Sequence, residues 1–419
     1  MPVSIHHIPR LLGLDHTLAL MRDPYEFISR HCRSFGWDVF EMRLLLRRTL
    51  CMTGADAAKV FYDPTRFKRA GAAPLRLQES LLGVGGVQSL DGVEHTHRKQ
   101  MFLSLMSSER LQELASIMTR TLRTGAERWS TLDRIVLYDE LHAVLTRSVC
   151  EWAGVPLPEE DVTKRAQQLC AMFDRAGAVG PPHWWSRHAR NRAERWMAEI
   201  IESIRAGRID SSQHSAAHQI ASYRDGQGQP LDAKTAAVEL LNVLRPTVAL
   251  SVYIVFLVHA LHMHPEYKRR LETQDGHLAQ AFVQEVRRFY PFFPAVPAIV
   301  RESFEWKGMP FTEGTRVLLD LHGVNHDPRV WKEPKLFMPD RFLSWQENAY
   351  TLVPQGGGDH LRNHRCAGEW LTIALMKAAL EFFVTGVSYQ LPEQDLGIDR
   401  TRLPALPRSR LILSDVRLL

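Results

Sequence analysis

The stretch that decides the fold runs from residue 354 to residue 370 and reads PQGGGDHLRNHRCAGEW. It combines glycines, histidines and arginines with a single cysteine, Cys366, and an apolar helical pattern begins at Leu371. Cys366 is therefore expected at or just before a helix N-terminus, where free N–H groups and the helix dipole stabilise a thiolate. The glycines allow the backbone to approach a flat ligand closely. A structural cysteine after a glycine-rich turn is the alternative.

Length and composition predict a soluble protein of one large domain or two ordinary ones, and the lack of a clean linker favours one. The chain has 419 residues, of which 45% are apolar and 24% charged, as in ordinary globular proteins. We expect a single domain over residues 1–419, mainly α with a small β portion. The net charge of +5 gives no nucleic-acid signal. The five cysteines include no CxxC pair, which argues against a disulfide framework or zinc site and favours a cytoplasmic location.

The longest helical pattern runs from Leu231 to His264, with Asp232 in the capping position. Its most apolar run, residues 248–261, is shorter than the roughly 20 residues of a membrane span, so no membrane anchor is expected. Elsewhere the patterns predict a strand over 37–51, a helix capped by Asp139, a helix over 278–290, and strands over 298–305 and 309–321.

Arg245 and Pro246 are anomalous in the middle of this long helix. Pro246 removes a backbone hydrogen bond and should distort the helix locally. The neighbours of Arg245 one turn away, at positions 241, 242, 248 and 249, include no acidic residue. A buried guanidinium without a partner is costly. Arg245 therefore either pairs with a distant carboxylate or binds an anionic ligand, and the sequence leaves both open.

His95 and Lys99 form a second candidate anion site. The helical pattern over 94–123 puts them at i and i+4, on one face. Two cationic side chains one turn apart can hold a dianion, although a solvated basic face has the same pattern.

Three spaced motifs occur in order: Glu285-x-x-Arg288, Phe337-x-Pro339-x-Arg341-Phe342 and His364-Arg365-Cys366-Ala367-Gly368. Together they resemble the cytochrome P-450 family of heme-thiolate enzymes, over essentially the whole chain. The resemblance implies the mainly α cytochrome P-450 fold with small β-sheets and a heme b cofactor. It implies these site residues: Cys366 as the axial thiolate, which ligates the iron; His95, Lys99 and His364 at the heme propionates; and Glu285, Arg288 and Arg341 as a structural charge cluster.

Two departures from the usual family pattern point to a subfamily. The cysteine loop is unusually long, and Arg245 and Pro246 stand where ordinary members carry an acid and an alcohol that deliver protons to dioxygen. Arginine stays charged and proline has no donor, so neither can relay a proton. Residues 238–249 and 354–360 closely resemble the fatty-acid peroxygenases.

The subfamily resemblance implies hydrogen peroxide as oxidant, a long-chain fatty acid as substrate and no redox partner. Arg245, with Pro246 beside it, would be the catalytic position, and the bound carboxylate would replace the missing acid–base residue. Hydroxylation would then occur near the carboxyl group.

The position of hydroxylation depends on residues near the carboxylate. Gln88 falls where decarboxylating members tend to carry histidine, which argues against decarboxylation. Leu82 and the 288–296 stretch, including Phe292, look more like the α-hydroxylating branch. We therefore favour the α-position over the β-position, with Arg245, Gln88, Leu82 and Phe292 contacting substrate. These residues could alternatively just line an apolar tunnel.

Two other functions share these motifs. A conventional monooxygenase that takes electrons from partner proteins is disfavoured by Arg245 and Pro246. A non-catalytic heme-thiolate protein that binds fatty acids is excluded by no residue of the sequence.

Overall fold

The computed structural model describes residues 7–174, 180–273 and 276–419. Its α-helices are α1 (Thr17–Arg22), α2 (Phe27–Phe35), α3 (Ala55–Phe61), α4 (Leu75–Leu77), α5 (Gly92–Ser104), α6 (Ser108–Trp129), α7 (Leu137–Ala153), α8 (Val162–Asp174), α9 (Pro181–Arg205), α10 (Ala216–Ser222), α11 (Ala233–Met263), α12 (Pro265–Leu271), α13 (Gly276–Phe289), α14 (Leu321–Asn325) and α15 (Glu369–Glu381). Short 3-10 or π-helical turns are η1 (Gln78–Leu82), η2 (Val87–Ser89), η3 (Glu159–Asp161), η4 (Pro339–Phe342) and η5 (Phe382–Gly386).

The strands are β1 (Val39–Leu44), β2 (Arg47–Met52), β3 (Phe67–Lys68), β4 (Arg134–Val136), β5 (Ala295–Val300), β6 (Phe304–Trp306), β7 (Met309–Phe311), β8 (Arg316–Asp320), β9 (Val387–Gln390), β10 (Ile398–Asp399), β11 (Leu406–Pro407) and β12 (Ile412–Leu418). The largest sheet has the order β1-β2-β8-β5-β3, in which only the β2–β8 pair is parallel. A three-stranded sheet, β4-β12-β9, and two strand pairs complete the β structure. The fold is thus mainly α with small sheets, as predicted.

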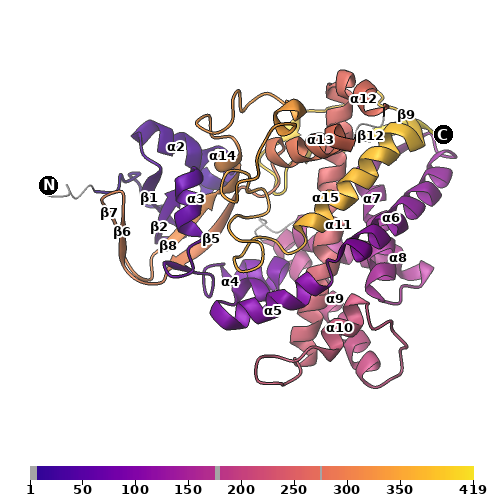
Figure 1. Ribbon diagram of the computed structural model, residues 1–419, viewed down its shortest axis with the longest axis horizontal. Coiled ribbons are helices and arrows are strands. Elements are labelled where there is room, and N and C mark those ends of the chain that lie inside the picture. The colour runs from indigo at the N-terminus through magenta and orange to yellow at the C-terminus, as the bar shows by residue number, and fades with distance from the viewer. Residues whose placement is uncertain (1–6, 175–179, 274–275) are drawn as a thin grey trace.

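The helices and the large sheet occupy opposite ends of the molecule (Figure 1). The large sheet lies with α2, α3 and α14, while the long helices pack together on the other side. A large apolar cluster fills the helical part, and two smaller clusters lie around the sheet. This arrangement leaves the segments between the two parts, including the cysteine loop, next to the central helix.

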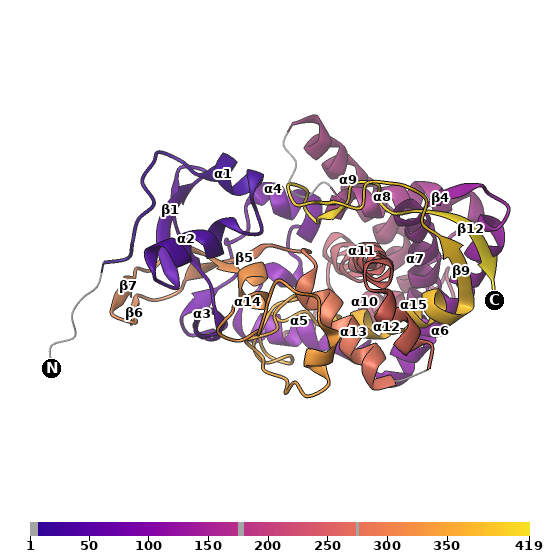
Figure 2. The ribbon, with the colours of Figure 1, turned by 90° about the horizontal axis from the view of Figure 1, so that it is seen from above.

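Helix α11 is the centre of the helical part, and Figure 2 shows it nearly end-on with other helices around it. Asp232 caps it as predicted, because its Oδ1 accepts the N–H of Thr235 at 3.0 Å. The helix continues through Pro246 without a break. By length and composition α11 could cross a membrane, but 94% of its most apolar window is buried within the fold. That burial is typical of a core helix.

Four local predictions were wrong. The strands expected over 298–305 and 309–321 are each interrupted, because β5 ends at Val300 before β6 begins at Phe304, and β7 ends at Phe311 before β8 begins at Arg316. Residues 37–51 form a hairpin of two strands rather than one strand, since Leu45 and Leu46 turn the chain with φ of 52° and 61°. Asp139 does not cap α7, which begins at Leu137, and its carboxylate instead pairs with Arg410 at 2.7 Å.

Candidate active site

The cysteine loop is a glycine-rich turn that leads into α15. Gly356 and Gly358 have φ of 92° and 84°, a region that favours glycine. A Cβ on Gly357 would lie 2.7 Å from the backbone oxygen of Ala349, so the close packing also requires glycine. The loop closes where the N–H of Cys366 donates to the carbonyl of Gln355 at 3.0 Å. Because α15 begins at residue 369, the predicted place of Cys366 just before a helix is confirmed.

Lys99 ties α5 to this loop. Its Nζ donates to the carbonyl of Arg365 at 2.7 Å and also to that of Asn363. Burial lowers the pKa of Lys99 to about 8, although the neighbouring Cys366 raises it. The ammonium group thus holds the backbone on both sides of residue 364.

Cys366 is suited to a metal rather than to a free thiolate. Burial raises the pKa of its thiol, while the N–H of Gly368 and the charges of Lys99 and Arg287 lower it. A bound metal ion would deprotonate the thiol, since a coordinated thiol loses its proton. Cys366 keeps some accessible surface, unlike the buried Cys32, Cys51 and Cys150.

Basic side chains gather beside the loop. The rings of His95 and His364 stack with their centroids 3.8 Å apart, and Nε2 of His364 lies 3.7 Å from Asp91. The guanidinium of Arg69 lies nearby and feels the charge of the same aspartate. Burial and then mutual repulsion lower the pKa of His95 to about 3, and burial lowers that of His364 to about 4. With Lys99 this makes four nitrogen groups for one carboxylate, a donor set that fits the two propionates of heme.

Arg245 is a buried cation without an anionic partner. Its side chain is 7% exposed, its Nη2 donates to Oδ1 of Asn242 at 3.4 Å, and its Nε has no partner. Within the described residues, no carboxylate lies at ion-pair distance from it, so the structure does not contain the distant carboxylate that was one alternative. Burial first, and then the nearby Arg190, lower its pKa to about 9, while Cys366 raises it. Arg245 and Cys366 thus interact electrostatically across the same interior.

Asn242 connects Gln88 to Arg245, whereas Leu82 and Phe292 pack against the apolar core. Gln88 accepts from Nδ2 of Asn242 at 3.3 Å, and Asn242 contacts Arg245. Leu82 ends η1 and Phe292 stacks on Tyr253 at 4.5 Å. Both are half-buried and pack against the large apolar cluster. Pro246 is half-buried beside Arg245.

Sequence reasoning missed several residues of this region. These are Arg69 at the basic edge, Asn242, Glu239 and Arg98 behind Arg245, and Arg190 on α9. Glu239 and Asn242 could have been noticed as polar residues in an apolar helix. No local pattern links Arg69, Arg98 or Arg190 to the site, because their contacts come from packing between distant segments.

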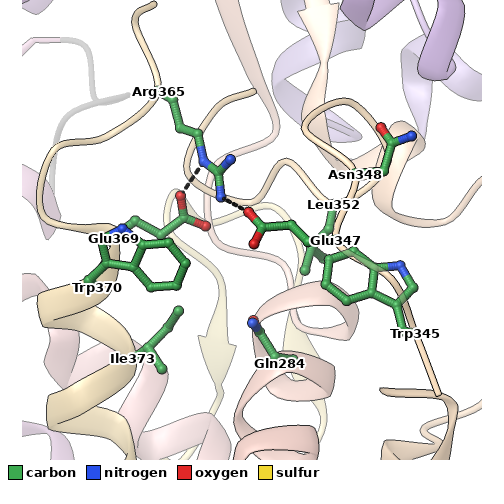
Figure 3. A pocket seen from close by; sticks show the side chains of 9 residues that line it. All are labelled: Gln284, Trp345, Glu347, Asn348, Leu352, Arg365, Glu369, Trp370 and Ile373. Carbon is green, nitrogen blue, oxygen red and sulfur yellow. Dashed lines mark hydrogen bonds and ion pairs between the residues drawn. The ribbon is translucent and has the colours of Figure 1, made fainter. Parts of the chain in front are cut away.

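The predicted charge cluster forms around Glu285. Glu285 binds Arg288 through two bonds of 2.7 Å, and Arg341 reaches the same carboxylate at 3.3 Å. Nearby, Arg365 lies between Glu369 at 2.5 Å and Glu347 at 2.8 Å, as Figure 3 shows. Every guanidinium in this region therefore has a carboxylate partner.

A mainly helical fold with a cysteine before its last long helix, and basic side chains suited to propionates, defines a heme-thiolate protein. The family model for cytochrome P-450 matches residues 161–407. The chain therefore belongs to the cytochrome P-450 family, whose members bind heme b through a cysteine thiolate. Curated relatives include cytochrome P-450 71A8 of Mentha piperita, 23% identical over 74% of this chain and 70% of that protein.

Solved structures resemble the chain more strongly. Cytochrome P450SP alpha (CYP152B1), in complex with (R)-ibuprofen, is 51% identical with a TM-score of 0.95, over 97% of this chain and 100% of that one. Cytochrome P450EX alpha (CYP152N1), with myristic acid, is 44% identical with a TM-score of 0.95, over 98% of this chain and 99% of that one. A variant of OleT with arachidonic acid is 32% identical at the same TM-score and coverage. Within the family, the protein is an enzyme of the CYP152 peroxygenase group.

Proposed function

We propose that this enzyme uses hydrogen peroxide to hydroxylate long-chain fatty acids at the α-carbon. Cys366 would hold the iron of heme b, and Arg245 binds the substrate carboxylate. The observation that carries the proposal is the buried guanidinium of Arg245, which has no carboxylate partner among the described residues. The solved relatives with myristic and arachidonic acid support a fatty acid as the missing anion.

When bound, heme with a thiolate ligand supplies the iron at which peroxide is activated. Arg245 presents a planar fork of donors that suits a carboxylate, and such charge-assisted bonds contribute roughly 1.5–3 kcal/mol. The carboxylate held there would serve as the acid–base group that takes up a proton and gives it back during the reaction. Arg245 stays protonated and Pro246 has no donor, so the substrate brings the acid–base group itself.

Arg245 also limits which carbon can react, because it holds the acid by its head. Only carbons close to the carboxyl group can then reach the oxidant. Gln88 accepts from Asn242 through its side-chain oxygen. Its neutral amide is not an acid, so Gln88 supplies no proton to the carboxylate, which disfavours decarboxylation. Half-buried Leu82 and Phe292 supply apolar surface for the chain. The α-position is favoured over the β-position, because the acid held by its head presents the carbon next to the carboxyl group first.

Electron-transfer partners are not part of the proposal. Arg365, next to Cys366, is committed to Glu347 and Glu369 and is therefore a poor docking charge for an acidic redox protein. The described cysteines, Cys32, Cys51, Cys150, Cys170 and Cys366, are all free. A reducing, cytoplasmic location fits them.

The test is turnover of the purified holoenzyme with myristic acid and hydrogen peroxide, without any reductase. Mass spectrometry should identify 2-hydroxymyristic acid as the main product. Turnover only with NADPH and electron-transfer proteins would instead establish the conventional monooxygenase. Binding of the acid without turnover under either condition would establish the binding protein. Arg245→Ala should reduce peroxide-driven turnover about a hundredfold or more, while the reduced-CO absorbance band stays at the heme-thiolate position.

A further inference from the structure

Glu239 is a buried carboxylate on α11 that the proposed mechanism does not use. It is 0% exposed, and its Oε1 lies 2.7 Å from Nη1 of Arg98 on α5, which is also buried. Burying such a pair costs desolvation energy that only well-supported geometry offsets. The other carboxylate oxygen of Glu239 accepts from Asn242, one turn further along α11.

Asn242 joins Glu239 to Arg245. Its Nδ2 donates to Oε2 of Glu239 at 2.9 Å and to Oε1 of Gln88 at 3.3 Å. An ionised carboxylate can only accept hydrogen bonds, so Glu239 keeps the amide nitrogen of Asn242 on its own side. The amide oxygen is left facing Arg245, whose Nη2 donates to it at 3.4 Å.

This arrangement orients Arg245 without neutralising it. The acceptor is a neutral amide at long range, so the guanidinium keeps its charge and its Nε remains without a partner. If the Asn242 amide were reversed, its NH2 group would face the N–H groups of Arg245, and the two donors would push the guanidinium away. A small displacement there moves the whole acid relative to the oxidant, and reaction geometry is sensitive to shifts on the order of 1 Å.

We propose that Glu239, anchored by Arg98, is a positioning residue for Arg245, acting through Asn242 to set the preference for the α-carbon over the β-carbon. The inference rests on the proposed function, because it takes Arg245 as the carboxylate site. Burial raises the pKa of Glu239, while the hydrogen bond from Asn242 and the charge of Arg98 lower it. Arg98 thus helps to keep Glu239 ionised. A protonated Glu239 could donate as well as accept and would no longer fix the orientation of the Asn242 amide.

Glu239→Gln in the holoenzyme tests the proposal, because the new amide can donate and no longer dictates the orientation of Asn242. With myristic acid and peroxide, the ratio of 2-hydroxy to 3-hydroxy product should fall about tenfold. The dissociation constant of myristic acid, read from the shift of the ferric Soret band, should rise about threefold to tenfold. The reduced-CO band should not move. A wild-type ratio together with a wild-type dissociation constant would overturn the proposal.

Asn242→Leu provides a second test, because it cuts the connection but leaves the pair of Glu239 and Arg98 in place. It should cause the same loss of α-selectivity. Combining it with Glu239→Gln should add nothing, since both changes interrupt one chain of contacts. Additive losses in the double variant would show that Glu239 acts by another route, and the proposal would fail.

Glu140→Gln is the matched control. Glu140 on α7 pairs with Arg128 and accepts from Trp129 at 2.7 Å, in a part of the fold separate from this chain of contacts. Its loss should leave product ratio and affinity unchanged. Failure of the proposed function would appear in the wild-type enzyme as no hydroxy acid with peroxide. Failure of this inference would appear as a working wild-type enzyme whose Glu239 variants keep its selectivity, and the affinity measurement tests Glu239 even without turnover.

Discussion

Arg288 and Arg245 are both buried arginines on helices beside the cysteine loop, but their surroundings differ. Arg288 is 0% exposed and donates two bonds of 2.7 Å to Glu285, and it also donates to three backbone carbonyls. Arg245 is 7% exposed and has one bond, of 3.4 Å, to a neutral amide. Charge and burial are nearly the same, and only the partners distinguish them.

The difference separates stability from function. A buried cation with full partners contributes to the fold, because removing it leaves an uncompensated carboxylate and unsatisfied carbonyls. A buried cation without an anionic partner costs stability in the free protein, and this cost is recovered only when an anion binds. Substitutions at four residues test the contrast, from the largest expected effect to the smallest.

Arg288→Ala should lower the free energy of unfolding by about 3–5 kcal/mol, because buried Glu285 loses both of its 2.7 Å bonds and keeps the longer ion pair with Arg341. Chemical denaturation of the holoprotein measures this loss, and the heme content of the purified variant should fall with it. Arg288→Ala with a free energy of unfolding within about 1 kcal/mol of wild type would contradict the structural role.

Arg245→Leu should leave stability unchanged or raise it by about 1–2 kcal/mol, because it removes a buried cation without an anionic partner. The same variant should lose peroxide-driven turnover, so stability and activity move apart. Arg245→Lys is the matched control that keeps the charge but not the bidentate fork, and it should weaken fatty-acid binding about tenfold. A large drop in the melting temperature of Arg245→Leu would refute the contrast with Arg288.

Lowering the pH should reduce the stability of the fold around Arg288 through His326. Burial first, and then the charge of Arg288, lower the pKa of His326 to about 3, against roughly 6.5 in an unfolded chain. Between about pH 6.5 and 3 the unfolded chain binds a proton at His326 and the folded protein does not, so the free energy of unfolding falls as the pH is lowered through this range. By pH 5 the loss should be at most about 2 kcal/mol. His326→Gln should show a shallower decline of melting temperature between pH 7 and 5, and an equally steep decline would exclude this residue as a cause.

Glu347→Gln should have the smallest effect. Glu347 binds Arg365 at 2.8 Å, but its side chain is 51% exposed, and Arg365 keeps Glu369 as a second partner. We expect a change in the free energy of unfolding below about 1 kcal/mol and an unchanged product ratio. Calorimetry together with product analysis checks both, and an altered product ratio would show that this paired region also affects chemistry.

Periodicity predicted the long elements well. The helix expected over residues 231–264 is α11, Ala233–Met263, and the helix expected over 278–290 is α13, Gly276–Phe289. Turns without typical turn residues were missed: the hairpin at Leu45 and Leu46 uses leucine at positive φ, where glycine or asparagine is the usual signal. That residues 1–419 form one domain remains a prediction.

The candidate site was predicted only in part. The motif residues could be placed because their spacing along the chain carries the information, and the structure brings Glu285, Arg288 and Arg341 together. It remains a prediction that heme binds at His95, Lys99, His364 and Cys366. The gathering of basic side chains beside the cysteine loop supports it. Arg69 and Arg98 could not be found, because no local pattern marks them.

The sequence by itself determined the family motifs and their order, the place of Cys366 before a helix, and the lack of an acidic neighbour for Arg245 on its own helix. Only the tertiary structure decided that no described carboxylate elsewhere in the chain reaches Arg245. It also decided that Arg98 meets Glu239 across 141 residues of sequence. The physical reason is that helical spacing governs contacts within about one turn, whereas contacts between distant segments depend on how whole elements pack.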